Sequence, residues 1–124
     1  MCDKESICRM NHFRLQEFAC NCCGANAISI LFVKKLDDAR ELAGIPFIIN
    51  SGWRCKAHNK AVGGTSTSSH LIGLAADIRC LSDSDRYIME EALRAVGLTR
   101  FGMGKNFLHV DDDQDKPQKR IWVY

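Results

Sequence analysis

Two histidines and one aspartate in the second half of the chain carry side chains that bind zinc: His70, Asp77 and His109. Two imidazoles and one carboxylate leave a tetrahedral zinc ion with one open position, the pattern of catalytic rather than structural sites. Such an ion lowers the pKa of a bound water to about 7 and polarises a carbonyl group, so an amide can be hydrolysed near neutral pH. The spacing alone is a weak signal, because a histidine beside serines also fits a turn or a cap.

Strands and a turn must bring these three residues together. Asp77 falls late in a predicted strand, 74–78, and His70 lies in the turn that enters it. A loop that folds back over this strand can place the imidazole beside the carboxylate. His109 lies on a second predicted strand, 107–111, and its side chain faces one side of that strand because side chains alternate with a period of two.

The remaining apolar pattern predicts two long helices and several short strands. The first helix covers 27–43, where apolar residues recur every three or four positions before Gly44 and Pro46. The second opens at Ser82 in a capping-box pattern and ends at Gly97. Further expected elements are a helical turn (13–18), a strand (47–49), a polar loop (51–69), a strand (100–104) and an edge strand (121–124). This order predicts an α+β fold with a small antiparallel sheet flanked by helices.

Length and composition indicate one domain. The chain has 124 residues, of which 46% are hydrophobic, enough for a core without disulfides. We assign residues 1–12 to an N-terminal arm and 13–124 to a single domain. The net charge of +2 does not indicate a nucleic-acid partner, and no apolar run reaches the ~18 residues that cross a membrane. The start lacks the apolar segment of a signal peptide, so we expect synthesis in the cytoplasm, and we expect a monomer.

The cysteines allow two interpretations. Seven cysteines cannot all pair within one chain, and reduced thiols are the default for a cytoplasmic protein. Cys20, Cys22 and Cys23 are close enough to suggest a second metal site, with Cys2, Cys8, Cys55 or Cys80 as possible partners. Structural zinc sites usually show two paired half-sites, whereas this sequence shows only C-x-C-C. We therefore prefer the interpretation that these are small buried thiols.

Four segments in order resemble the zinc D-Ala-D-Ala carboxypeptidase family. That family includes D-Ala-D-Ala dipeptidases, phage L-Ala-D-Glu endolysins and, by shared fold, the hedgehog signalling domain. The segment 68–77 matches the signature S-x-H-x-x-G-x-A-x-D. The other three are S-G-[YW]-R at 51–54, N-x-x-V-G-G at 59–64 and a closing H-x-D at 109–111. The chain is thus identified as a member of the short phage or prophage branch, with a hedgehog/DD-peptidase-like fold.

The resemblance implies a role for each matching residue. Arg54 corresponds to the arginine that faces the substrate carbonyl, where a fixed cation stabilises the oxyanion; the alternative is a surface salt bridge. Ser68 corresponds to a residue lining the substrate site, or it caps the turn. Trp53 is a candidate wall of the substrate cleft, or it packs in the core. The implied zinc ligands are His70, Asp77 and His109.

One position departs from the family. Many members carry a Glu or Asp three residues before the final ligand histidine, where it acts as general base. This chain has Asn106 there, which cannot take a proton at neutral pH. Asp111 is our candidate for the base, because i, i+2 spacing on a strand puts it on the same face as His109. The alternative is that Asp111 orients a metal ligand.

The resemblance implies a zinc metallopeptidase, a D,D- or L,D-type carboxypeptidase or endopeptidase. Its expected substrate is a D-amino-acid-containing peptide bond in bacterial peptidoglycan stem peptides. The lack of a signal peptide or wall-binding domain suits a phage or prophage endolysin, acting at the cell wall or periplasm. A competing hypothesis, favoured by Asn106, is a zinc-bound, non-catalytic cell-wall-binding module. A third makes the cysteine cluster the functional centre, as a redox or structural zinc unit.

Overall fold

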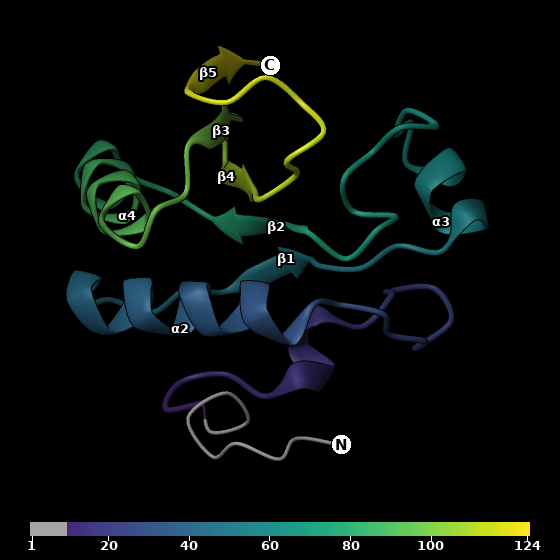
Figure 1. The fold of residues 1–124 in the computed structure, drawn as a ribbon, viewed down its shortest axis with the longest axis horizontal. Helices are drawn as coiled ribbons and strands as arrows, with labels where there is room; N and C mark the ends of the chain where they lie inside the picture. Colours follow the sequence, from purple (N-terminus) through teal and green to yellow (C-terminus); the bar gives the residue numbers. More distant parts are fainter. Residues whose placement is uncertain (1–9) are drawn as a thin grey trace.

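The computed structural model describes residues 10–124, which form three helices, a short 3₁₀ helix and one five-stranded sheet (Figure 1). Most of the expected N-terminal arm lies outside the described residues. Within them, the amides of Asn11 and His12 donate to the carboxylate of Asp37 at 3.0 and 2.8 Å. The elements are η1 (Leu15–Phe18), α2 (Ile30–Ala43), β1 (Ile49–Ser51), α3 (Lys56–Ala61), β2 (Ala75–Arg79), α4 (Asp83–Ala95), β3 (Arg100–Met103), β4 (Phe107–Asp111) and β5 (Arg120–Val123).

The sheet has the strand order β1-β2-β4-β3-β5. All neighbours are antiparallel except β3 and β5, which are parallel. The α+β prediction is confirmed, and the expected edge strand exists, with a parallel rather than antiparallel partner. Because β4 lies at the centre, the two strands expected to carry Asp77 and His109 are direct neighbours.

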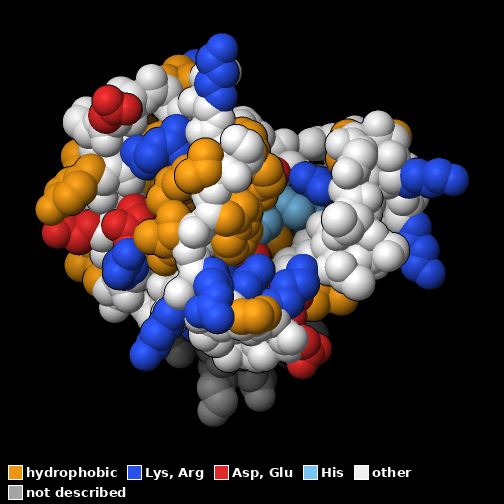
Figure 2. Space-filling model, turned by 90° about the horizontal axis from the view of Figure 1, so that it is seen from above, with side chains coloured by type: hydrophobic (Ala, Val, Ile, Leu, Met, Phe, Trp, Pro, Cys, Tyr) orange, Lys and Arg blue, Asp and Glu red, His pale blue; other side chains and the backbone are white. Residues whose placement is uncertain are grey.

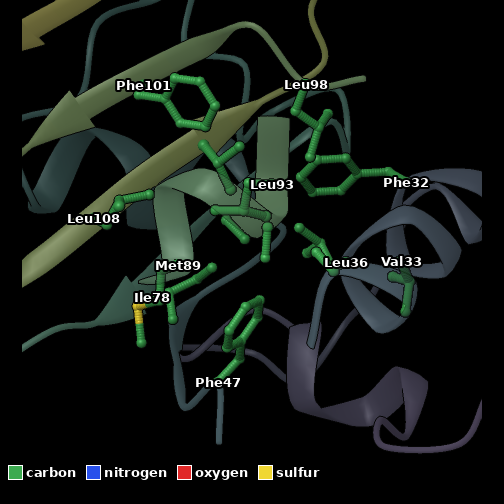
Figure 3. Packing of buried hydrophobic residues seen from close by; sticks show 14 of the residues in the cluster. Phe32, Val33, Leu36, Phe47, Ile78, Met89, Leu93, Leu98, Phe101 and Leu108 are labelled. Atoms are coloured by element: carbon green, nitrogen blue, oxygen red, sulfur yellow. The ribbon is translucent and has the colours of Figure 1, made fainter. Parts of the chain in front are cut away.

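The side chains on the two faces of the sheet have different surroundings. Ala76, Ile78, Leu108 and Val110 are fully buried and belong to one hydrophobic core with residues of α2 and α4. Figure 3 shows this packing, in which side chains from the strands meet those of the two helices. Since side chains alternate along a strand, the residues between them point to the opposite face, which we call the site face. The helices thus cover one face and leave the site face for chemistry.

Local capping explains where the two long helices begin and end. The Ser29 hydroxyl accepts from the amide of Phe32 at 3.2 Å, and Gly44 ends α2 in a left-handed conformation at φ 69°. The Ser82 hydroxyl accepts from the amide of Asp85 at 3.1 Å and opens α4. In the described part of the chain, no helix is long and apolar enough to cross a membrane.

Two expected elements differ from the structure. The polar loop 51–69 contains the six-residue helix α3, which is too short and polar to produce an apolar stripe. The strand expected at 47–49 begins at Ile49 instead, and Phe47, which precedes it, is fully buried in the core. Arg54 therefore lies in the short segment between the end of β1 and the start of α3.

Candidate metal centre

The three predicted ligands converge on the site face. Asp77 and His109 are paired residues of β2 and β4, and His109 Nδ1 lies 2.9 Å from Asp77 Oδ1. His70 enters from the loop before β2, and its Nε2 lies 3.3 Å from the same carboxylate oxygen. The two imidazole rings meet edge to face with centroids 5.2 Å apart. One ligand atom from each of these residues lies within 4.8 Å of the other two.

A backbone carbonyl sets the orientation of the His70 ring. Its Nδ1 lies 2.7 Å from the carbonyl oxygen of Gly52, which can only accept, so Nδ1 carries the proton and neutral Nε2 keeps a lone pair. The backbone at Gly52 also passes close to η1, since a Cβ there would lie 2.6 Å from the Cα of Phe18. A glycine is therefore required in the segment that matches S-G-[YW]-R.

Asp111 orients the second imidazole in the same way. Its Oδ2 lies 2.8 Å from Nε2 of His109, so Nε2 donates and neutral Nδ1 turns its lone pair toward Asp77. Two imidazole lone pairs and one carboxylate oxygen then face one another with no proton to share. Such a group of acceptors fits a cation, and this donor set is one that catalytic zinc prefers.

The same contacts shift pKa values in the absence of a cation. Burial raises the pKa of Asp77, but hydrogen bonds and positive charge from His109 and His70 outweigh it and hold this pKa well below 3.8. Burial lowers the pKa of His109, but hydrogen bonds with Asp111 and Asp77 outweigh it and raise this pKa above 6.5. A metal-free site therefore favours a protonated His109 held between two carboxylates.

Three acceptors hold the Arg54 side chain against the metal centre. Its Nε donates to Ser51 Oγ at 3.1 Å, Nη1 to Asn59 Oδ1 at 3.2 Å and Nη2 to Asp77 Oδ2 at 3.2 Å. The buried amide of Asn59 also donates to the carbonyl of Thr65 at 2.8 Å, which ties Arg54 to the loop before His70. Only 13% of the Arg54 side chain is exposed, so it forms no ordinary surface salt bridge.

A second set of charges supports His109 from the other side. Asp111 is 2% exposed and accepts from Arg100 Nε at 2.7 Å as well as from His109. The Arg100 guanidinium stacks on Trp122 at 4.9 Å, and the Trp122 ring lies 5.5 Å from the His109 ring. Sequence reasoning missed Arg100 and Trp122, because only the pairing of β3 with β4 and β5 brings them to the site.

The metal centre opens into a cavity of about 440 Å³. Figure 2 shows histidine surface at the bottom of a hollow between two lobes of the molecule. Ser68 lines this cavity, and its hydroxyl accepts from the amide of His70 at 3.2 Å. Lys116 also lines the cavity and donates to the carbonyl of Thr67 at 2.7 Å.

Two residues singled out from the sequence lie outside this lining. The indole of Trp53 donates to the carbonyl of Leu71 at 2.9 Å and so ties the segment before Arg54 to the loop that follows His70. Asn106 is exposed in the turn between β3 and β4, where its carbonyl accepts from the amide of Cys80. The aromatic lining of the cavity comes instead from Phe107, Trp122 and Tyr124.

A convergent His-Asp-His triad, a fixed arginine and an open cavity together define a metal-dependent hydrolase site. The sequence profile of the peptidase M15 family matches residues 11–111, which is most of the chain. This protein therefore belongs to the peptidase M15 family, whose members are metal-dependent peptidases, and the family prediction is confirmed. A comparison with curated proteins finds no significant match.

Proposed function

We propose that this protein is a zinc metallopeptidase that hydrolyses a D-amino-acid-containing peptide bond in peptidoglycan stem peptides. The observation that carries the proposal is the convergence of His70, Asp77 and His109 in an open cavity beside Arg54. Family membership supports the reaction class, and the motif resemblance supports the choice of substrate. Whether it acts as a carboxypeptidase or an endopeptidase follows from the products that it releases.

Each residue has a separate task in the proposed reaction. Zinc, when bound by the triad, lowers the pKa of its water to about 7 and polarises the scissile carbonyl, which supplies a nucleophile near neutral pH. Arg54 stabilises the charge that develops on the carbonyl oxygen, and its anchoring by Ser51 and Asn59 keeps it in place beforehand. Ser68 lines the path of the peptide.

We assign Asp111 to positioning rather than to proton transfer. Both of its oxygens are occupied: Oδ1 accepts from Arg100 and from the amide of Asp113, and Oδ2 accepts from His109. A buried carboxylate with these contacts holds the imidazole in the ligating tautomer, as outer partners of metal-bound histidines do. Hydrogen bonds with His109 and Arg100 outweigh burial and lower the pKa of Asp111 below 3.8, so it is a poor proton acceptor near neutral pH.

We further propose that the protein serves as a phage or prophage endolysin, made in the cytoplasm and acting at the cell wall or periplasm. The support is the resemblance of its motifs to the short, phage-associated branch of the family. One observation favours a second candidate, a zinc-bound cell-wall-binding module. Among the described residues, the carboxylates that line the cavity are Asp77 and Asp111, and both accept hydrogen bonds from neighbouring side chains. Neither is therefore a free carboxylate that could act as general base.

Digestion of purified muropeptides separates the two candidates. The protein is incubated with stem peptides of defined length and with cross-linked dimers, and the products are identified by mass spectrometry. We expect cleavage of one peptide bond, loss of cleavage after chelation and recovery on adding Zn²⁺. Retention of zinc and binding to peptidoglycan with every peptide intact would support the binding module instead.

A further inference from the structure

Four cysteines outside the peptidase motifs converge at one point of the surface. Cys20, Cys22 and Cys23 lie in the turn after η1, and Cys55 follows Arg54 at the start of α3. Their four sulfur atoms all lie within 4.8 Å of one another. The Sγ of Cys22 is 3.6 Å from that of Cys20 and 3.4 Å from that of Cys55.

These sulfur separations suit a shared metal ion. A tetrahedral zinc ion with Zn–S bonds of about 2.3 Å holds its sulfurs about 3.8 Å apart, whereas a disulfide bond is about 2.05 Å. The chain closes around the point where such an ion would lie. The amide of Gly24 donates to the carbonyl of Cys20 at 2.9 Å, and the amide of Cys20 donates to the carbonyl of Ala25 at 2.7 Å. Gly24, at φ 75°, provides the left-handed residue for this turn.

Backbone amides also point at the sulfurs. The amide of Cys55 lies 3.5 Å from the Sγ of Cys20, and the amide of His58 lies 3.4 Å from the Sγ of Cys55. Hydrogen bonds of this kind favour the thiolate, which is the form that binds metal. Four thiolates at this distance need a cation to balance their repulsion.

The exposure of the thiols argues against a packing role. Cys22 and Cys23 are exposed, so the interpretation of the cluster as small buried thiols is wrong for these two residues. Cys80, in contrast, is 1% exposed within the core and fits that description. Cys22 is exposed and Cys55 is half-buried, so burial alone does not explain why these two thiols, 33 positions apart in sequence, converge on the buried Cys20.

We propose that Cys20, Cys22, Cys23 and Cys55 bind a structural Zn²⁺ ion as a tetrahedral tetrathiolate. The four thiols release their protons to solvent as the ion binds. Four protein ligands leave no open position, so this ion has no catalytic role. It ties the turn 20–25 to the residue next to Arg54. The site is independent of the proposed peptidase activity and uses none of its ligands.

Zinc content of single-site variants tests the proposal. All are made in a background in which Cys2, Cys8 and Cys80 are serine, and they are purified with a thiol reductant and without chelator. By plasma mass spectrometry we expect two zinc ions in the background protein, and one in both Cys22→Ser/Cys23→Ser and His70→Ala. The one retained by His70→Ala, replaced by Co²⁺, should show the intense visible absorption of tetrahedral cobalt thiolate.

The two sites fail in different ways. If Cys22→Ser/Cys23→Ser keeps as much zinc as the background protein, the tetrathiolate site is overturned. If His70→Ala keeps as much zinc as the background protein, only the catalytic site is in doubt. A thiol reagent covers the case in which the double variant does not fold. Zinc should protect Cys22 and Cys23 in the folded background protein until a chelator is added, whereas immediate reaction of both would overturn the proposal.

Discussion

Arg54 and Asp77 form an ion pair in which the two carboxylate oxygens of Asp77 have different partners. The Nη2 of Arg54 lies 3.2 Å from Oδ2 of Asp77, while Oδ1 of the same carboxylate faces both histidines. The arginine is therefore fixed relative to the metal ligands by a direct contact. Arg54 also takes its backbone position from a ligand, because its amide donates to the carbonyl of His70 at 3.2 Å.

Replacing Arg54 should lower turnover and leave the metal in place. We expect Arg54→Ala to reduce kcat by ~10²–10³, about 3–4 kcal/mol, because an oxyanion partner is lost. Arg54→Lys should recover only part of this, since an ammonium cannot keep three forked hydrogen bonds. Muropeptide hydrolysis and zinc content are the measurements. Arg79→Ala on the exposed end of β2 is the control, and an equal loss there would remove the assignment.

Asp111→Asn distinguishes positioning from proton transfer. If Asp111 is a positioning residue, Asp111→Asn should lower the affinity for zinc by ~10–100-fold. Saturating zinc should then restore most of the turnover. A general base would cost ~10²–10⁴ in turnover at any zinc concentration and would remove the acidic limb of the pH profile. Asp112→Asn, whose carboxylate pairs with Lys35, is the matched control. A loss that zinc does not rescue would return Asp111 to the role of base.

Removing either imidazole should empty the catalytic site. We expect His70→Ala and His109→Ala each to lose one zinc ion per chain and all measurable hydrolysis, because two remaining ligands bind zinc weakly. His12→Ala, which loses only a contact with Glu41, should keep both. Atomic absorption and muropeptide digestion are the measurements. Unchanged zinc in both ligand variants would show that the triad is not the metal site.

Gly102→Ala tests whether Trp122 forms a wall of the cavity. A Cβ on Gly102 would lie 2.6 Å from Nε1 of Trp122, so the indole must move, at a cost of about 1–3 kcal/mol in stability. We expect a lower Tm, changed tryptophan fluorescence and slower hydrolysis with zinc retained. Gly102→Ala should lower the stability by less in a Trp122→Ala background, since the effects of substitutions at contacting residues do not add. Strict additivity would mean that the clash is elsewhere.

The stabilisation by zinc should grow as the pH rises through the raised pKa of His109. In the metal-free protein, Asp77 with its lowered pKa stabilises the fold above about pH 4, and this is lost as pH falls through the folded pKa. His109 with its raised pKa stabilises the fold below about pH 6.5, and this is lost as pH rises through the folded pKa. As the pH rises, the metal-free site therefore contributes less to the stability of the fold. Zinc binds more readily over the same range, because it no longer competes with a proton for His109.

The difference in Tm with and without zinc checks this dependence. It is measured in the Cys22→Ser/Cys23→Ser variant, so that only the His-Asp site responds. A difference that shrinks as the pH rises would contradict the proton positions inferred for the site.

The sequence predicts well those parts of the site that depend on local pattern. The period of two placed Asp77 and His109 on strands, and the apolar stripe and caps located α2 and α4. Residues that reach the site through distant pairing were not predictable in this way. Trp122 comes to His109 only because β5 joins β3 in parallel, and no residue pattern in 120–123 encodes that partner.

The cysteines illustrate the same limit. C-x-C-C supplies three of the four cysteines of the proposed metal site, and the fourth, Cys55, is a single residue in a polar segment without a second paired motif. Their convergence depends on η1 lying beside Gly52, a contact between residues that are far apart in sequence. Trp53, for which the sequence allowed either a cleft wall or core packing, is not among the residues that line the cavity, and its indole donates to the carbonyl of Leu71.

The central position of β4 determines when activity can first exist during synthesis and folding. β4 must insert between β2 and β3 before His109 meets Asp77, 32 positions earlier in the chain, and nearly the whole domain has been made by then. Contacts of this range form late, because the entropy of closing the intervening loop opposes them. A nascent or partly folded chain therefore has no assembled metal centre. A chain that lacks a paired β4 therefore lacks one of the three residues that converge at the candidate metal centre.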